Sequence, residues 1–418
     1  MAGWRGGTFA AFQSRSFTIL WSGAFLAFIA FFMSTAVQAV VAFDLAGNNK
    51  AVGFVILAQG ISQLLLGPFG GALADRLSKR MVILACQSII TVAFLAAAIL
   101  VATDTITVAL LALSSFLIGL AFSFLGPARQ GLLVEFVGPA RRGNAIALSQ
   151  VALNASRILA PFIAAAALGI GVIGAAGAFF IMTALYVAAM ACTIALPATK
   201  PASANRPAVL GEIWSGIRYV ARTPRIRVLV PSYILVIMCG FPYVSVLPGL
   251  VKNEFGRDAS QITWLLTINA VGGLATSLAV ASLADSRRAP AIYTGMCLVF
   301  GISLIVLGLM PSYWLLFLPM FVVGAAGGGF QTLNGALVSH LADPAYFGRV
   351  VSLTFLAFAS SSVVALPVGS IADHFGEQPT IAASGVAVCA LVIAFEVLGR
   401  MVDRRSAAPD APHPVNAG

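Results

Sequence analysis

The sequence has little charge for its length. Asp, Glu, Lys and Arg make up 9% of its 418 residues, whereas a typical soluble domain has about 25%. Hydrophobic residues make up 60% of the chain, and the mean hydropathy is +0.99. These values exclude a soluble globular protein and indicate a polytopic protein embedded in a lipid bilayer.

Histidine and cysteine are also scarce, and neither forms a chemical pattern. The three histidines are scattered over predicted loops and the tail, and no Ser/His/Asp or metal-ligand set converges. Each cysteine falls in a separate apolar run, with no CxxC spacing; they are Cys86, Cys192, Cys239, Cys297 and Cys389. We therefore predict no enzyme activity, no cofactor and no metal site.

Long apolar runs dominate the chain. Because a membrane-spanning helix needs about 20 apolar residues, the sequence predicts roughly twelve spans and no sizeable soluble domain. We place them at 17–43, 52–74, 81–102, 106–126, 145–168, 172–196, 228–250, 260–284, 290–309, 313–338, 350–372 and 379–399. An even number of spans puts both termini on the same side.

The 24 Lys and Arg residues are distributed unevenly about these spans. Only Lys50, Lys252 and Arg257 fall in loops on one side, and Arg157 lies inside a span. The others gather on the opposite side, which the positive-inside rule identifies as cytoplasmic. The net charge of +10 therefore reflects membrane topology rather than nucleic-acid binding, and we predict a cytoplasmic-membrane protein with both termini inside the cell.

An internal repeat indicates two similar halves. A Pro, Gly and Leu pattern recurs 205 residues later: Pro139, Gly143 and Leu148 match Pro344, Gly348 and Leu353. A second pattern, Ala/Ser-Leu-Ala-Asp, recurs after 210 residues, so that Asp75 matches Asp285. We predict parallel six-helix halves at 1–196 and 228–400, joined by a cytoplasmic linker with an amphipathic helix at 197–227 and followed by a disordered cytoplasmic tail at 401–418.

Three stretches resemble a known superfamily. The pattern Gly71-x-x-x-Asp75-Arg76-x-x-Lys79-Arg80 resembles the loop between the second and third helices of major facilitator transporters, with Ser78 where that family usually has glycine. Residues 126–130 (GPARQ) and 154–161 (NASRILAP) resemble a bacterial exporter group that includes macrolide efflux proteins and the enterobactin exporter. The resemblance implies the all-α major facilitator fold, with a substrate site between two halves that rock during alternating access.

The resemblance also implies gating residues, namely Asp75, Arg76, Arg80, Glu135, Pro161 and Asp285. In the family, the acid at Asp75 accepts hydrogen bonds from a helix terminus across the halves, and the arginine at Arg76 pairs with an acid, for which Glu135 is available here. Asp285 is the weaker counterpart. Alternatively, Asp75 is merely solvated and Pro161 only kinks its helix.

Arg157 is informative because it lies near the middle of its span. A central arginine costs roughly 2.5–3.5 kcal/mol on an insertion scale, so it should face the bundle or a water-filled cavity. Its candidate partners are Gln38, Gln59, Gln63, Asn154, backbone carbonyls or the substrate. Arg157 either takes part in substrate binding or conformational coupling, or it bonds to helix ends and holds the first half together.

In the second half, Gln331 and Asn334 either face the cavity or only form hydrogen bonds between helices.

The expected cavity helices are aromatic and apolar, with Phe28, Phe31, Phe32, Tyr243 and Trp264. This favours a transporter that exports a lipophilic or amphipathic small molecule. We expect the transporter to be a monomer. Proton antiport is implied by the resemblance, but the spans contain almost no acid; Asp44, Asp75 and Asp373 are the candidate carriers. The alternatives are a lysophospholipid flippase and a sugar or small-metabolite importer. A channel is disfavoured because no filter loop or charged ring is present.

Overall fold

The computed structural model describes residues 10–407 apart from 139–140, 170–172, 198–208, 282, 284–285, 287 and 344–345. This part of the chain is helical and contains no strand. Twelve of its segments are long and apolar enough to cross a membrane. The structure thus confirms the predicted all-α fold with twelve spans.

The N-terminal half begins with a short 3-10 helix at Ala10–Gln13. Six long helices follow: α1 (Arg15–Ala46), α2 (Asn49–Arg76), α3 (Lys79–Ala102), α4 (Val108–Val137), α5 (Arg142–Gly169) and α6 (Gly174–Ile194). Helix α4 continues well past the predicted end of its span at residue 126. Pro127 lies inside this helix. A membrane helix tolerates a proline where neighbouring groups compensate for the missing hydrogen bond.

The linker helix is α7 (Val209–Arg222). The C-terminal half then consists of α8 (Ile226–Gly240), α9 (Tyr243–Gly249), a π-helical turn (Leu250–Glu254), η4 (Ala259–Gln261), α10 (Ile262–Ala281), α11 (Ala289–Gly308), η5 (Tyr313–Leu316), α12 (Phe317–Leu341), α13 (Phe347–Phe375) and α14 (Glu377–Ala407). The predicted span 228–250 is broken before α9, where Pro242 precedes the new helix. Helix α14 continues to Ala407, into the predicted tail.

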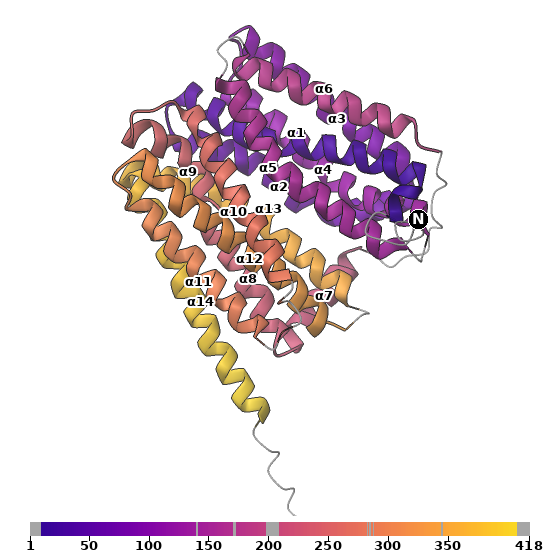
Figure 1. The fold of residues 1–418 in the computed structure, drawn as a ribbon, viewed down its shortest axis with the longest axis vertical. Coiled ribbons are helices and arrows are strands. Elements are labelled where there is room, and N and C mark those ends of the chain that lie inside the picture. Colours follow the sequence, from indigo (N-terminus) through magenta and orange to yellow (C-terminus); the bar gives the residue numbers. More distant parts are fainter. Residues whose placement is uncertain are drawn as a thin grey trace, which may run out of the picture.

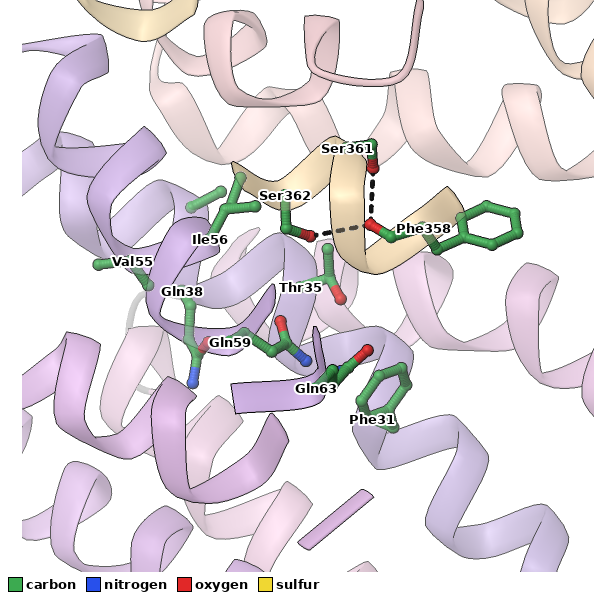
Figure 2. Close-up of a pocket in the computed structure, with 11 residues that line it drawn as sticks. Phe31, Thr35, Gln38, Val55, Ile56, Gln59, Gln63, Phe358, Ser361 and Ser362 are labelled. Carbon is green, nitrogen blue, oxygen red and sulfur yellow. Dashed lines mark hydrogen bonds between the residues drawn. The ribbon is translucent and has the colours of Figure 1, made fainter. Parts of the chain in front are cut away.

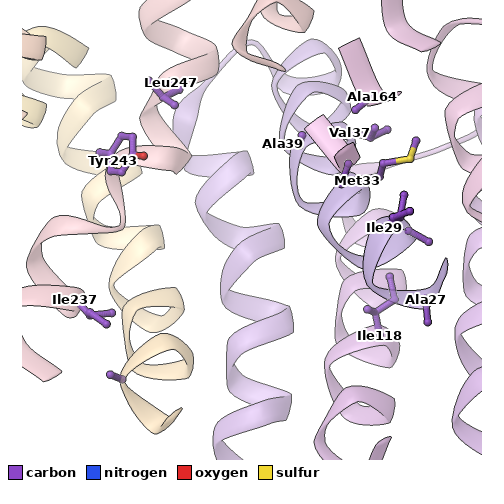
Figure 3. Packing of buried hydrophobic residues seen from close by; sticks show 14 of the residues in the cluster. Ala27, Ile29, Met33, Val37, Ala39, Ile118, Ala164, Ile237, Tyr243 and Leu247 are labelled. Carbon is purple, nitrogen blue, oxygen red and sulfur yellow. The ribbon is translucent and has the colours of Figure 1, made fainter. Parts of the chain in front are cut away.

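Small residues allow the helices to approach one another closely. A Cβ atom at Gly119 of α4 would collide with the carbonyl oxygen of Gln59 in α2, and one at Gly324 of α12 would collide with that of Asn269 in α10. Such contacts replace hydrophobic burial as the packing device in lipid. Figure 3 shows apolar side chains along α1, including Ile29, Met33 and Val37, packed within the bundle.

The two halves lie side by side, and α2 of the first packs along α13 of the second, while α5 packs against α10 (Figure 1). We call the end of the bundle at which α2 begins the Asn49 end, and the opposite end, at which α3 begins, the Lys79 end. At the Asn49 end, the start of α2 is hydrogen-bonded to Asp373 and Glu377 of the other half, and Asp44 forms an ion pair with Lys252. The two halves are therefore fastened together at this end.

Helix α7 is docked on the C-terminal half. The Tyr219 ring stacks on Tyr346 with centroids 4.3 Å apart, and its hydroxyl accepts a hydrogen bond from the Asp343 backbone N–H at 2.9 Å. Trp214 and Ile217 remain exposed at 65% and 43%. An amphipathic helix with exposed Trp and Ile beside membrane spans is typical of the bilayer interface.

Candidate functional site between the two halves

Arg157 lies in the middle of α5, about 18 Å along the helix from its last residue at a rise of 1.5 Å per residue. Its side chain is exposed, and its guanidinium lies over the Phe32 ring of α1 at 5.4 Å from the centroid. The Tyr233 hydroxyl of α8, in the other half, is within electrostatic range. No described carboxylate pairs with Arg157, so the space between the halves holds one cation at mid-membrane depth.

A separate pocket of about 190 Å³ lies where α1, α2 and α13 meet, so both halves contribute to it (Figure 2). Its lining residues are Phe31, Thr35, Gln38, Ala39, Val55, Ile56, Gln59, Gln63, Phe358, Ser361 and Ser362. None of them carries a charge. Figure 2 shows the amides of Gln59 and Gln63 beside Thr35, which places several uncharged donors and acceptors together.

One residue in the pocket lining has an amide donor without a hydrogen-bond partner. The Gln38 side chain is 3% exposed, and its Oε1 accepts a hydrogen bond from Ser115 Oγ at 2.6 Å. Its buried Nε2 has no hydrogen-bond partner among the described residues. Ser361 and Ser362 instead donate to the Phe358 carbonyl of their own helix, at 2.8 and 3.2 Å. A buried donor without a partner is costly, and this one belongs to a residue that lines the pocket.

The structure groups some of the predicted binding residues and separates others. Gln38, Gln59 and Gln63 share the pocket, but Arg157 is not among its lining residues. Asn154 precedes Arg157 by one turn on α5 and is half-buried. On α12, Gln331 is half-buried whereas Asn334 is 3% exposed. Asn334 is buried among the packed helices, and its Oδ1 has no hydrogen-bond partner among the described residues.

The predicted gating residues are only partly described. Asp285 and the side chains of Asp75 and Arg76 lie outside the described residues, although the backbone of the last two belongs to α2. Glu135 accepts a charge-assisted hydrogen bond from Lys79 at 3.2 Å. Arg80 donates to the Thr193 and Ile194 carbonyls at 3.2 and 2.6 Å, at the end of α6. Pro161 lies inside α5.

Arg129 corrects the prediction that Arg157 is the only basic residue within a span. Because α4 extends to Val137, Arg129 belongs to a span, and it is 8% exposed. Its guanidinium lies over Phe28 at 4.6 Å, and its Nη2 has no described hydrogen-bond partner. The buried Tyr186 hydroxyl, which also lacks a described partner, is within electrostatic range.

A signal for Arg129 exists in the sequence. Arg129 and Asn334 are separated by 205 residues, the spacing of the repeat, and both are buried polar residues at matching places in α4 and α12. The predicted span at 106–126 ended before Arg129 and so did not include this position.

Comparison with known proteins identifies the family. The sequence pattern of the family described as "Transmembrane secretion effector" matches residues 6–415. The chain belongs to this family of major facilitator transporters. Among its curated relatives, the staphyloferrin A transporter of Staphylococcus aureus is 22% identical over 84% of this chain and 88% of that protein. Macrolide efflux protein A of Streptococcus pyogenes is 20% identical over 90% of this chain and 94% of that protein.

Solved structures support the same fold. The nucleoside transporter NupG superposes with a TM-score of 0.77 at 14% identity, covering 92% of this chain and all of that one (100%). A bacterial homologue of the lysosomal transporter Spinster, in an inward-facing conformation, gives a TM-score of 0.76 at 12% identity, covering 95% and 99% of the two chains. The major facilitator chain described here is thus a multi-pass membrane transporter with efflux proteins among its relatives.

Proposed function

We propose that this major facilitator protein exports a lipophilic or amphipathic small molecule across the cytoplasmic membrane by alternating access, driven by proton antiport. The excess of Lys and Arg at the Lys79 end supports a cytoplasmic location for that end and for both termini. The Asn49 end then faces outward. The protein acts as a monomer of two six-helix halves, at 1–196 and 228–400.

The observation that carries this proposal is the exposed Arg157 in the middle of α5. An unpaired cation at this depth costs roughly 2.5–3.5 kcal/mol on an insertion scale, and its contact with Phe32 recovers about 0.5–2 kcal/mol. A residue kept at such a cost where two mobile halves face each other is better explained by contact with a substrate than by stability. Aromatic rings around one cation suit an amphipathic molecule with an anionic or carbonyl group.

The relatives support the direction of transport. Macrolide efflux protein A and the multidrug efflux pump Tap of Mycolicibacterium fortuitum, which is 27% identical over 46% of this chain and 47% of that protein, are named as exporters. The bonds that fasten the halves at the Asn49 end support a conformer closed toward the outside. Opening that end requires a gate at the other, for which we propose Asp75, Arg76, Glu135 and Asp285, with Pro161 as a bending point in α5.

The test is transport of a panel of lipophilic dyes in proteoliposomes, with and without an imposed pH gradient. Arg157→Ala should lower gradient-driven extrusion by about tenfold or more. Leu159→Ala, two residues away on the same helix and 39% exposed, is the matched control and should transport normally. If no dye moves under any gradient while the wild-type protein is folded, the substrate class is wrong; the same panel should then include a lysophospholipid and small metabolites.

A further inference from the structure

One face of α7 is packed against the C-terminal half. The Tyr219 ring stacks on Tyr346 beside the start of α13. A Cβ atom at Gly216 would lie only 3.1 Å from the Cβ atom of Arg349, and Val220 is buried. Because these contacts fix the rotation of α7 about its own axis, they also decide which of its residues point away from the bundle.

The opposite face of α7 carries an exposed apolar stripe. Trp214, Ile217 and Ala221 are exposed, and their spacing of three and four residues places them in one row along the helix. An apolar row on a surface helix of a membrane protein is suited to the boundary between lipid headgroups and acyl chains. Tryptophan favours this depth in particular, because its ring is apolar and its N–H group is polar.

A row of arginines borders this stripe. Arg218 follows Trp214 by four residues and Arg222 follows Arg218 by four, so the two arginines lie on the same side of the stripe, about one helical turn apart. Both side chains are exposed, and neither has an ion-pair or hydrogen-bond partner in the part of the chain that the structure describes. Two further arginines follow within five residues, whereas no Asp or Glu lies between 213 and 253. The guanidinium groups of Arg218 and Arg222 are therefore available to an anion.

The position of α7 decides which anions it meets. The helix packs against the start of α13, whose far end carries Asp373 at the Asn49 end, so α7 lies at the opposite, Lys79 end of the bundle (Figure 1). Only three residues separate α7 from the membrane span that begins at Ile226. The arginine row is therefore held where the chain enters the bilayer, and the anions concentrated at that depth are phospholipid headgroups.

We propose that Trp214, Ile217, Arg218 and Arg222 form a binding surface for anionic phospholipids. Trp214 and Ile217 insert beneath the headgroups, and the two guanidinium groups bind phosphate oxygens, to which an arginine can donate two parallel hydrogen bonds. Because α7 is stacked on Tyr346 and also packs against α2 of the other half, a lipid bound here contacts the helix that joins the two halves. The inference rests on the proposed function only for assigning this leaflet to the cytoplasmic side.

Fluorescence quenching by brominated phospholipids tests this surface directly. The full-length protein is placed in nanodiscs of phosphatidylglycerol and phosphatidylcholine, with bromine on one lipid or on the other. The signal of Trp214 is the difference between the wild type and Trp214→Phe. Because each arginine near the surface favours an anionic lipid roughly fivefold, phosphatidylglycerol should be enriched beside Trp214 by about tenfold or more at low salt. The enrichment should fall as salt is added, since salt screens exposed charges.

Two variants separate this surface from the general positive charge of the Lys79 end. Arg218→Gln combined with Arg222→Gln removes the arginine row, so the enrichment should fall close to one while Trp214 is still quenched. Arg141→Gln is the matched control, because it removes an exposed arginine of the N-terminal half at the same end. This control should keep the wild-type enrichment.

Three results would overturn the proposal. The wild type could be quenched equally by the two lipids, or the enrichment could survive the double substitution. If neither lipid quenches Trp214, the stripe lies outside the bilayer and is left for a protein partner. The measurement needs no substrate and no gradient, so its failure leaves the proposed export function standing, and a failure of dye export leaves the lipid surface standing.

Discussion

Two arginines on consecutive helices show how the interior of one half differs from the surface between the halves. Arg129 in α4 and Arg157 in α5 both lie over a phenylalanine ring, at 4.6 and 5.4 Å. Arg129 is buried within the N-terminal half, whereas the Arg157 side chain is exposed and faces Tyr233 of the other half. The same kind of side chain therefore lies in the core of one half in one case and at the surface between the halves in the other.

The largest expected effect is on transport at the exposed arginine. Arg157→Ala should lower the rate of dye export by about tenfold or more, because a lost charge-assisted hydrogen bond to a substrate is worth about 1.5–3 kcal/mol. The melting temperature in detergent should change little, since the side chain is exposed. A variant that melts far below the wild type would instead assign Arg157 to the core.

The buried arginine should behave in the opposite way. Arg129→Met replaces an unpaired buried charge with an apolar side chain of similar size, a change that is often neutral or stabilising by about 1–4 kcal/mol. We expect a higher melting temperature and normal export, measured on the same preparations as Arg157→Ala. Loss of export from a well-folded Arg129→Met protein would remove the distinction between the two arginines.

The pocket between α1, α2 and α13 tests whether uncharged groups at the surface between the halves also bind substrate. Gln59→Leu removes one amide, and a hydrogen bond contributes about 0.5–1.5 kcal/mol. The KM for export should therefore rise roughly two- to tenfold, with kcat nearly unchanged. Val55→Ala, in the same lining, serves as the apolar control. A fall in kcat alone would assign Gln59 to the conformational change instead.

The smallest effect is expected at a charge on the rim of the N-terminal half. Lys79 binds Glu135 at 3.2 Å, and their side chains are 16% and 42% exposed. Partly solvated pairs of this kind contribute about 0.2–1 kcal/mol. Lys79→Ala should lower the free energy of unfolding by about that amount. A loss of export much larger than the loss of stability would show that the pair takes part in gating.

The sequence predicted the spans well because each depends on a local run of apolar residues. It ended the fourth span at residue 126, before Arg129, whereas α4 continues to Val137. It named Asp373 only as a candidate proton carrier and gave Glu377 no role. Neither residue lies near Asn49 in the sequence; Asp373 is separated from it by 324 residues. No local pattern indicates such a pairing.

Composition, hydropathy and the 205-residue repeat by themselves determined a twelve-span membrane protein with an internal repeat, because the bilayer requires long apolar helices and the repeat is present in the residues. The tertiary structure alone decided which polar side chains meet: which arginine is buried, which amides share a pocket and which carboxylates cap α2. The physical reason is that these contacts arise where helices distant in sequence pack together, and small differences in helix rotation decide which side chains face one another.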